Sequence, residues 1–135
     1  MTDDSVRENV ADELRLAASA LRSAEALLQL ELTPDAASRI YYAAFHAARA
    51  LLYSIGIEAH SHSGIRTLVS RHFVREGRFA AERMKDLSQL EALREAGDYD
   101  SAFILGVAEL RPELARAQRF VDEVTTLLRA AGAVP

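Results

Sequence analysis

Arginine, histidine and tyrosine side chains stand together in two short stretches of this chain, and such side chains can bind phosphate and move protons. Arg39 and His46 belong to the first stretch, and Arg94, Asp98 and Tyr99 form the second. An arginine can hold a phosphate and its developing negative charge, and a histidine can exchange protons near neutral pH. Both stretches are therefore candidate sites for a phosphate ester, with either a catalytic or a binding role.

Arg39 and His46 are separated by six residues. On a helix this spacing puts both side chains on one face, two turns and about 10.5 Å apart along the axis. One phosphate could not bridge them directly within a chain, although a dimer could pair each with the other chain's copy. The favoured alternative is structural: Arg39 stands near a helix start, and His46 is a satisfied, partly buried polar group.

Arg94, Asp98 and Tyr99 also have two interpretations. In the structural one, which we favour, Asp98 caps the helix or pairs with Arg94, and Tyr99 packs on an interface with its hydroxyl bonded. In the functional one, Arg94 binds phosphate, and Tyr99 stacks on a base or offers a hydroxyl for modification.

Tyr41 and Tyr42 would point about 100° apart on a helix, so we expect one in the core and the other at a cleft or dimer seam. The histidines His60, His62 and His72 raise the question of a metal site. No acid or histidine pair stands at ligand spacing, so we expect neither a metal nor a cofactor. We expect His62 to shape or cap a helix start, where a neighbouring serine, Ser61 or Ser63, can serve as the N-cap.

A further group of basic residues could form a local positive strip. A solvated helix face is the usual meaning of such a run, and RNA contact is the alternative. The group consists of Arg66, Arg71, Arg75, Arg78, Arg83 and Lys85.

Length and charge limit the classes of function. The 135 residues predict one domain, residues 1–135, and the net charge of −4 gives no overall basic field, so an RNA ligand would need a local patch. The absence of cysteine excludes disulfides and thiolate zinc sites and fits a reducing compartment. No stretch predicts a signal peptide or membrane span, so we expect a cytoplasmic protein without membrane contact.

Apolar residues recur every three or four positions along most of the chain, which predicts helices over 4–31, from Thr33 to about 55, 65–75, 79–96 and 107–131. Thr33 is the expected N-cap of the second helix, Gly56 its left-handed end, and Gly97 to Tyr99 the interruption that ends the fourth. No segment alternates with period two. The predicted fold is all-α: an up-and-down bundle of four long helices plus one short helix, with its core over about 4–131.

The stretch from Ile40 to Ile55 is apolar on nearly every side. We expect it to be the central helix, packed on other helices on one side and on a partner chain on another. The chain is therefore predicted to form a homodimer.

Three blocks of the sequence, taken together, resemble one known family. The blocks are SRIYYAAFHAARALL at 38–52, HSGI at 62–65 and REAGDY at 94–99. In this order and spacing they resemble the HEPN family, the higher eukaryotes and prokaryotes nucleotide-binding domain, in its small single-domain prokaryotic branch. The resemblance spans roughly residues 10 to 130.

The resemblance implies a dimerising helical bundle, often encoded beside a minimal nucleotidyltransferase in a toxin–antitoxin-like pair. Many relatives cut RNA without metal, and others bind nucleotides or serve as partner subunits. The cutting members carry an arginine, four to six residues and a histidine, brought together from two chains across an interface cleft. Here no histidine follows Arg94, and Tyr99 stands where the histidine would be.

The hypothesis that follows is a binding and partner module that holds nucleotide or RNA in a dimer-interface cleft, without strong catalysis of its own. One alternative is a metal-independent ribonuclease toxin, using Arg94 with an unusual partner or Arg39 with His46. Another is a structural helical adaptor. The predicted ligand-binding residues are Arg94, Asp98, Tyr99, Tyr41, Tyr42 and His46.

Overall fold

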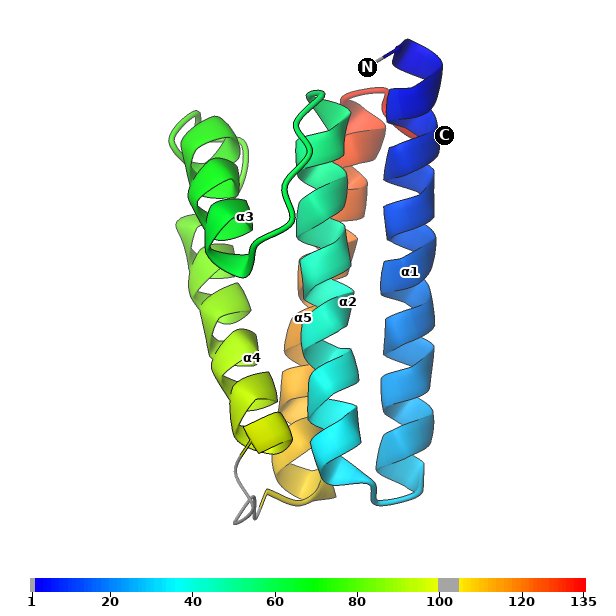
Figure 1. Cartoon of the computed structure of the whole chain (residues 1–135), viewed down its shortest axis with the longest axis vertical. Coiled ribbons are helices and arrows are strands. Elements are labelled where there is room, and N and C mark those ends of the chain that lie inside the picture. The colour runs from blue at the N-terminus through cyan, green and yellow to red at the C-terminus, as the bar shows by residue number, and fades with distance from the viewer. Residues whose placement is uncertain (1, 100–104) are drawn as a thin grey trace.

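The computed structural model describes residues 2–99 and 105–135, and these residues form a helical bundle with no strand among them (Figure 1). The long helices are α1 (Asp3–Gln29), α2 (Thr33–Ser54), α4 (Ala81–Tyr99) and α5 (Val107–Ala130). A shorter segment, α3 (His62–Val69), continues into a π-helical turn, η1 (Ser70–Val74). The long helices run alternately down and up, with both termini at one end. The predicted all-α bundle of four long helices and one short helix is confirmed.

Helix ends follow the sequence with small shifts. The Thr2 side chain accepts a hydrogen bond from the Ser5 backbone amide at the start of α1, and Ser61 caps α3 in the same way through Gly64. Gly56 adopts the left-handed conformation expected after α2, with φ of +77°. The predicted N-cap of α2 was wrong by one residue, because Thr33 is already helical and Leu32, which cannot cap with its side chain, precedes it.

The predicted boundaries of two helices were also wrong. The third helix begins at His62 rather than Ile65, since Ser61 provides the cap. The fourth helix begins at Ala81 rather than Phe79 and runs through Gly97 to Tyr99 without interruption. Gly97 keeps its helical conformation because it packs closely on the start of α2: a Cβ atom there would lie 3.2 Å from the Pro34 carbonyl oxygen.

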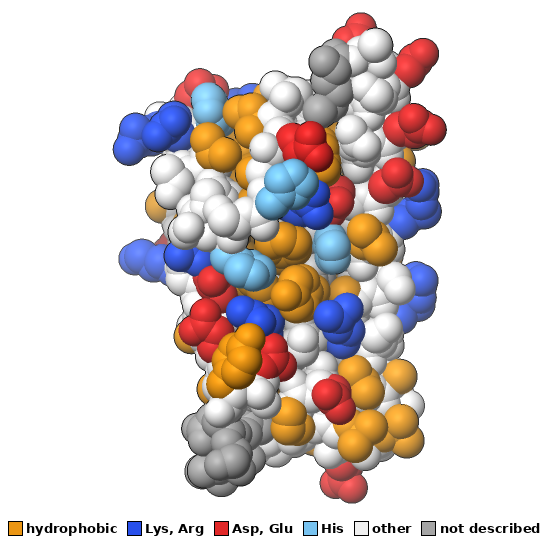
Figure 2. All heavy atoms as spheres, viewed as in Figure 1, with side chains coloured by type: hydrophobic (Ala, Val, Ile, Leu, Met, Phe, Trp, Pro, Cys, Tyr) orange, Lys and Arg blue, Asp and Glu red, His pale blue; other side chains and the backbone are white. Residues whose placement is uncertain are grey.

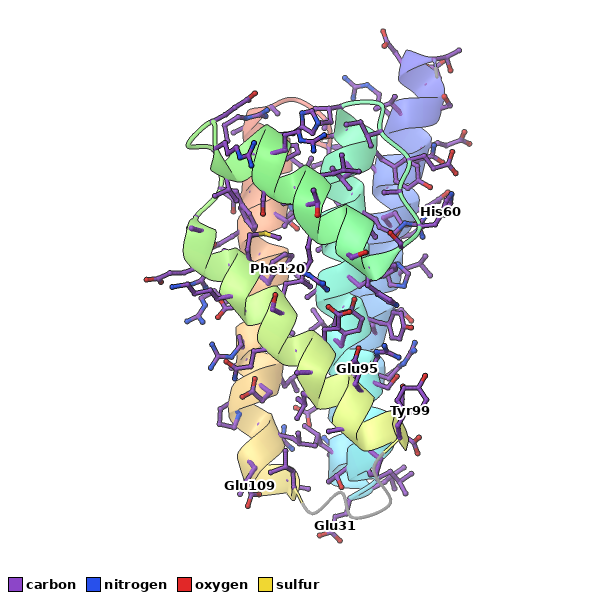
Figure 3. All side chains as sticks on the ribbon, turned by 60° about the vertical axis from the view of Figure 1, so that its left-hand side comes forward. Glu31, His60, Glu95, Tyr99, Glu109 and Phe120 are labelled. Atoms are coloured by element: carbon purple, nitrogen blue, oxygen red, sulfur yellow. The ribbon has the colours of Figure 1, made fainter. Side chains whose placement is uncertain are left out.

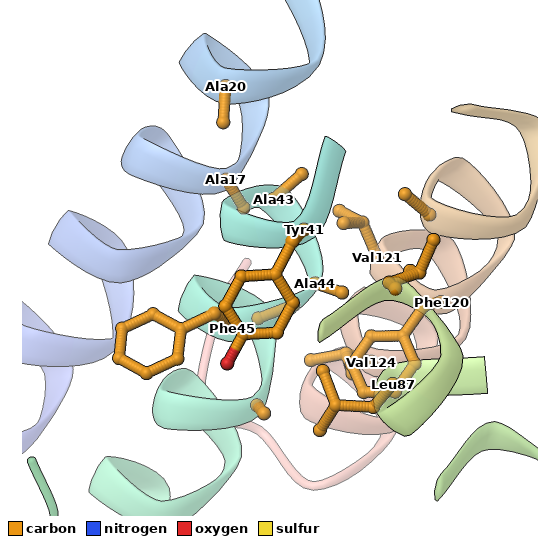
Figure 4. Close-up of a cluster of buried hydrophobic side chains, with 14 of the residues drawn as sticks. Ala17, Ala20, Tyr41, Ala43, Ala44, Phe45, Leu87, Phe120, Val121 and Val124 are labelled. Atoms are coloured by element: carbon orange, nitrogen blue, oxygen red, sulfur yellow. The ribbon is translucent and has the colours of Figure 1, made fainter. Parts of the chain in front are cut away.

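The core is centred on α2, which packs against α1, α4 and α5. Its many buried alanines let neighbouring helices come close, as Ala43 of α2 does with Ala17 of α1 (Figure 4). Larger side chains such as Phe120 of α5 fill the space between α2, α4 and α5. Helices of the same chain therefore account for the apolar character of α2, and the predicted homodimer needs other support. No described helix has the length and apolar character of a membrane span.

Candidate functional site

An aromatic surface on α2 forms the base of the candidate site. The rings of Tyr41, Tyr42 and Phe45 stack edge-on or tilted, with 5.2 Å between the two tyrosine centroids and 5.4 Å from Tyr42 to Phe45. Tyr41 is only 2% exposed, whereas Tyr42 is partly exposed. The two tyrosines thus divide as expected from their 100° separation, with one in the core and one at the surface.

Arg94 reaches this aromatic surface from α4. Its guanidinium carbon lies 5.5 Å from the Tyr41 ring centre and 5.8 Å from that of Tyr42. The residue is 9% exposed, and its Nε atom is buried without a hydrogen-bond partner among the described residues. Burial acts to lower the pKa of Arg94, but Tyr42, Tyr99 and Asp98 together raise it above its ordinary value, so the group stays charged.

Asp98 and Tyr99 stand on the last turn of α4. Asp98 accepts a hydrogen bond from Arg94 Nη1 at 3.1 Å, the pairing that the structural interpretation expects. Tyr99 is 80% exposed, so no packing against the described part of this chain holds its ring (Figure 3). Its side chain forms a hydrogen bond with Arg94, which favours the charged guanidinium and raises the pKa of Arg94.

Arg39 adds a second guanidinium to the site. Its guanidinium carbon lies 4.9 Å from the Tyr42 ring centre, and no carboxylate of the described residues forms an ion pair with it. Arg94 also lies over this ring. Tyr42 is therefore flanked by two cations, one from its own helix and one from α4.

His46 lies on the same face of α2, and a side chain of α1 holds its ring in place. Its Nδ1 atom is 2.7 Å from Glu13 Oε2, and Glu13 is a buried residue of α1. The other carboxylate oxygen of Glu13 lies 3.3 Å from Arg49 Nη1, and Arg49 also donates to the hydroxyl of Tyr53. The two candidates Arg39 and His46 thus sit on one face, as their spacing predicts, but only His46 has a polar partner.

His62 is the site residue that sequence reasoning missed, since it was expected only to shape a helix start. The segment after α2 runs back along the bundle and delivers His62 to the aromatic surface (Figure 1). Its Nδ1 atom is 2.5 Å from the Tyr41 hydroxyl, and its ring centre is 5.1 Å from that of Phe45. Burial, with the nearby cations Arg94 and Arg66, lowers the pKa of His62. Only its place in the second family-like block could have indicated this role.

The face that carries these residues is mixed in character. Figure 2 shows hydrophobic side chains in its middle, bordered by histidine, arginine and acidic side chains. The described residues contain no group of three or more histidine, aspartate or glutamate side chains placed to hold a metal ion. The arrangement offers cations, imidazoles and aromatic rings, a combination that suits an anionic, partly aromatic ligand.

The predicted basic strip is interrupted by ion pairs at two of its residues, while Arg71, Arg75, Arg78 and Lys85 are exposed. Arg66 pairs with Glu91, and Arg83 is buried against Asp86. A groove of about 850 Å³ lies away from the candidate site, between Phe79 and α5. Arginines and acids alternate with apolar side chains along it, so it has no preference for an anion.

The protein is a helical bundle whose central helix carries an aromatic surface contacted by arginines. Comparison with known proteins identifies its family. The model of the HEPN domain matches residues 10–131, and the chain belongs to this family. The resemblance stated from the three sequence blocks is thereby confirmed.

Several relatives match over most of their length. A UPF0332 protein of Thermotoga maritima is 31% identical over 114 residues, which cover 84% of this chain and 86% of that protein. A Methanocaldococcus jannaschii protein named "Putative toxin MJ0605" is 27% identical over 129 residues, or 96% of each chain. Among solved structures, TT1696 from Thermus thermophilus superposes with a TM-score of 0.75 at 22% identity, covering 88% of this chain and 98% of that one, and shares the fold.

Proposed function

We propose that this HEPN protein is a binding and partner module that holds the phosphate of a nucleotide or RNA on the surface formed by Arg94, Arg39 and Tyr42, without strong catalysis of its own. The observation that carries the proposal is the state of Arg94. It is a nearly buried guanidinium whose Nε atom has no partner among the described residues. Its partners are a carboxylate of its own helix and two aromatic rings, so the guanidinium stays charged at this surface, where it can bind an anion.

The neighbours of Arg94 favour a phosphate that belongs to a nucleotide. Arg39 also contacts the Tyr42 ring and has no carboxylate partner among the described residues, so two guanidinium groups can share one or two phosphates. The partly exposed Tyr42 and the exposed Tyr99 offer aromatic faces to a base. The acidic net charge of the chain means that this local group, rather than the whole protein, must attract the ligand.

The test is binding of a fluorescein-labelled, single-stranded oligoribonucleotide, followed by anisotropy at two salt concentrations. We expect Arg94→Ala to weaken binding by about tenfold or more, because an arginine–phosphate contact contributes about 1.5–3 kcal/mol. The matched control is Arg22→Ala, which removes the same charge from an exposed position on α1. Equal affinities for the two variants would contradict the proposal.

A second candidate function is a metal-independent ribonuclease. It is favoured by two imidazoles, those of His46 and His62, which lie against the same Phe45 ring near Arg94. The test is cleavage of a labelled RNA pool in excess chelator by wild type, Arg94→Ala, His46→Ala and His62→Ala. Cleavage that disappears in any of these variants would move the protein to the ribonuclease class.

The role as a partner protein is supported by membership of the HEPN family and not by a surface of this chain. We propose that the protein acts in the cytoplasm as a homodimer beside a minimal nucleotidyltransferase, in a toxin–antitoxin-like pair. The relative with toxin in its name is consistent with this setting. Light scattering that shows a monomer at micromolar concentration would contradict the dimer. A chain that binds neither RNA nor the co-expressed nucleotidyltransferase would leave the structural adaptor as the remaining alternative.

A further inference from the structure

We propose that His62 and His46 are the ligand-facing hydrogen-bonding groups of this site and that their roles are opposite and fixed. His62 donates from Nε2 to a phosphate oxygen, and His46 accepts at Nε2 from a ribose hydroxyl. Tyr41 and Glu13 act as positioning residues that set these two roles. The inference rests on the proposed function and adds to it the part of the ligand that each imidazole meets.

The role of His62 follows from its contact with Tyr41. The Tyr41 hydroxyl is buried, and its one hydrogen-bond partner in the described part of the chain is His62 Nδ1, at 2.5 Å. A buried hydroxyl proton needs an acceptor, and burial raises the pKa of Tyr41, so the phenol keeps its proton and donates it. His62 Nδ1 must then carry the lone pair, and in the neutral imidazole the ring proton lies on Nε2.

The role of His46 is the reverse. Its Nδ1 atom faces a carboxylate oxygen of Glu13 at 2.7 Å, and a carboxylate only accepts hydrogen bonds. Arg49, at 3.3 Å from the other oxygen, supplies the positive charge that a buried carboxylate requires. His46 therefore holds a proton on Nδ1, and in the neutral form of the ring Nε2 presents a lone pair.

Both Nε2 atoms are available on one surface. Neither has a hydrogen-bond partner among the described residues, and neither is among the buried unpaired polar atoms, so both reach solvent. The two rings pack against Phe45 with centroid distances of 5.1 and 5.4 Å, and against Tyr42 at 6.3 and 6.2 Å. A ligand lying across Tyr42 would thus meet a donor on one side and an acceptor on the other.

The combination selects a ribose phosphate over a simple anion. Arg94 and the His62 donor both suit phosphate oxygens, but the His46 acceptor is unfavourable to them and needs a hydrogen to bind. The group next to a phosphate in a ribonucleotide that can supply this hydrogen is the 2′-hydroxyl, which deoxyribose lacks. The site should therefore distinguish RNA from DNA through His46.

The experiment compares a labelled single-stranded oligoribonucleotide with the 2′-deoxy strand of the same sequence. We expect wild type to bind the RNA about tenfold more tightly. His46→Ala should bring the RNA affinity down to the DNA value and leave the DNA affinity unchanged. His62→Ala should weaken both strands alike, whereas the control His60→Ala, an exposed histidine of the same segment, should change neither.

The positioning roles have their own readout, the tautomer of each ring in nitrogen-15 NMR spectra of the free protein. We expect the proton on Nδ1 of His46 and on Nε2 of His62. In Tyr41→Phe, which lacks the hydroxyl, we expect His62 to show a mixture of both tautomers in place of one. A proton on the opposite nitrogen of either ring would overturn the assignment, even if a histidine variant failed to fold.

The outcomes of the binding experiment separate the two proposals. Equal RNA and DNA affinities in wild type, with binding still lost in Arg94→Ala, would overturn the histidine roles and keep the phosphate site. Binding of neither strand by folded wild type would overturn both.

Discussion

Two regions of this bundle gather arginines, and they use them differently. Between α4 and α5, the buried Asp86 lies 2.7 Å from Arg116, 3.1 Å from Arg83 and 3.6 Å from Arg119, and Glu123 lies 3.6 Å from Arg83. These charges compensate one another and link the two helices. At the candidate site, the arginines meet mainly aromatic rings.

The contrast lies in the partners of the arginines. Arg39 has no carboxylate partner in the described part of the chain, and Arg94 pairs only with the exposed Asp98 and Glu95 of its own helix, at 3.1 and 4.0 Å. Ion pairs between helices, such as those of Asp86, stabilise the fold and leave few charged groups available to bind a ligand. Guanidinium groups that pack on aromatic rings keep N–H donors available, and these donors can form hydrogen bonds to a phosphate. The first region is thus expected to govern stability and the second to govern binding.

The largest expected effect is on the first region. Asp86→Ala would leave Arg83 and Arg116 without their shared carboxylate, and removal of one partner from a buried ion pair costs about 3–5 kcal/mol. We expect this loss in the free energy of unfolding by urea, with RNA affinity of the folded fraction unchanged. Asp122→Ala, which removes an exposed acid of α5, is the control and should stay within about 0.5 kcal/mol of wild type. Similar stabilities for the two variants would remove the proposed difference between the regions.

The opposite result is expected for Arg94→Met, which should lower RNA affinity and keep stability. The methionine chain can pack on Tyr41 and Tyr42, and Asp98, left alone, is exposed enough to stay hydrated. The free energy of unfolding should change by less than about 1 kcal/mol while RNA affinity falls by about tenfold or more. Urea denaturation and anisotropy on the same preparation measure both. A loss of stability as large as that of Asp86→Ala would make Arg94 a structural residue.

A smaller effect is expected from pH at His62. Its pKa in the folded protein is below the ordinary 6.5, through burial and then through Arg94 and Arg66, while the unfolded chain keeps the ordinary value. As pH falls through 6.5, the unfolded state takes up a proton that the folded state binds only at lower pH, so stability decreases. Well above this pH both states are neutral at this residue, and its contribution is constant.

The measurement is the urea midpoint of wild type and His62→Gln between about pH 7.5 and about pH 5.5. The glutamine oxygen can still accept from Tyr41, so the contact is kept while the titration is removed. Wild type should lose more stability than the variant over this range. The remaining histidines are the same in both proteins, so their contributions cancel in the difference. Parallel curves would show that His62 does not carry a lowered pKa.

Sequence reasoning could predict the bundle because its evidence is local and repeated. Apolar spacing predicted every long helix, and Gly56 marks the end of α2 with positive φ as expected. The 100° separation of Tyr41 and Tyr42 likewise predicted their different burial. The errors fell where tertiary contacts decide: Gly97 favours a helix stop in the sequence, but its lack of a side chain lets α4 continue against α2.

The candidate site was predicted only in part, for a similar reason. Arg94, Asp98 and Tyr99 are close in the chain and could be grouped from spacing, and the same holds for Tyr42 and His46. His62 belongs to the site through a segment that folds back along α2, and Glu13 belongs to it through packing of α1. No local pattern relates these residues to Arg94, so a search for a histidine after Arg94 in sequence could not find the one beside it in space.

The smallest expected effect tests how the two helices position the site. In Gly97→Ala, better helix propensity is worth about 1 kcal/mol, but the new Cβ atom would lie 3.2 Å from the Pro34 oxygen and 3.4 Å from Ala37 Cβ. These backbone and core atoms have little freedom to yield, so the gain and the crowding should nearly cancel in the free energy of unfolding. Relief of this contact would move the last turn of α4 outward. Arg94 lies one turn before it and would shift with the helix. We therefore expect a twofold to threefold loss of RNA affinity, or roughly 0.5 kcal/mol. Anisotropy of the variant beside wild type measures it. A stabilised variant with unchanged affinity would mean that the close approach of α4 to α2 is not what places Arg94 on the aromatic surface.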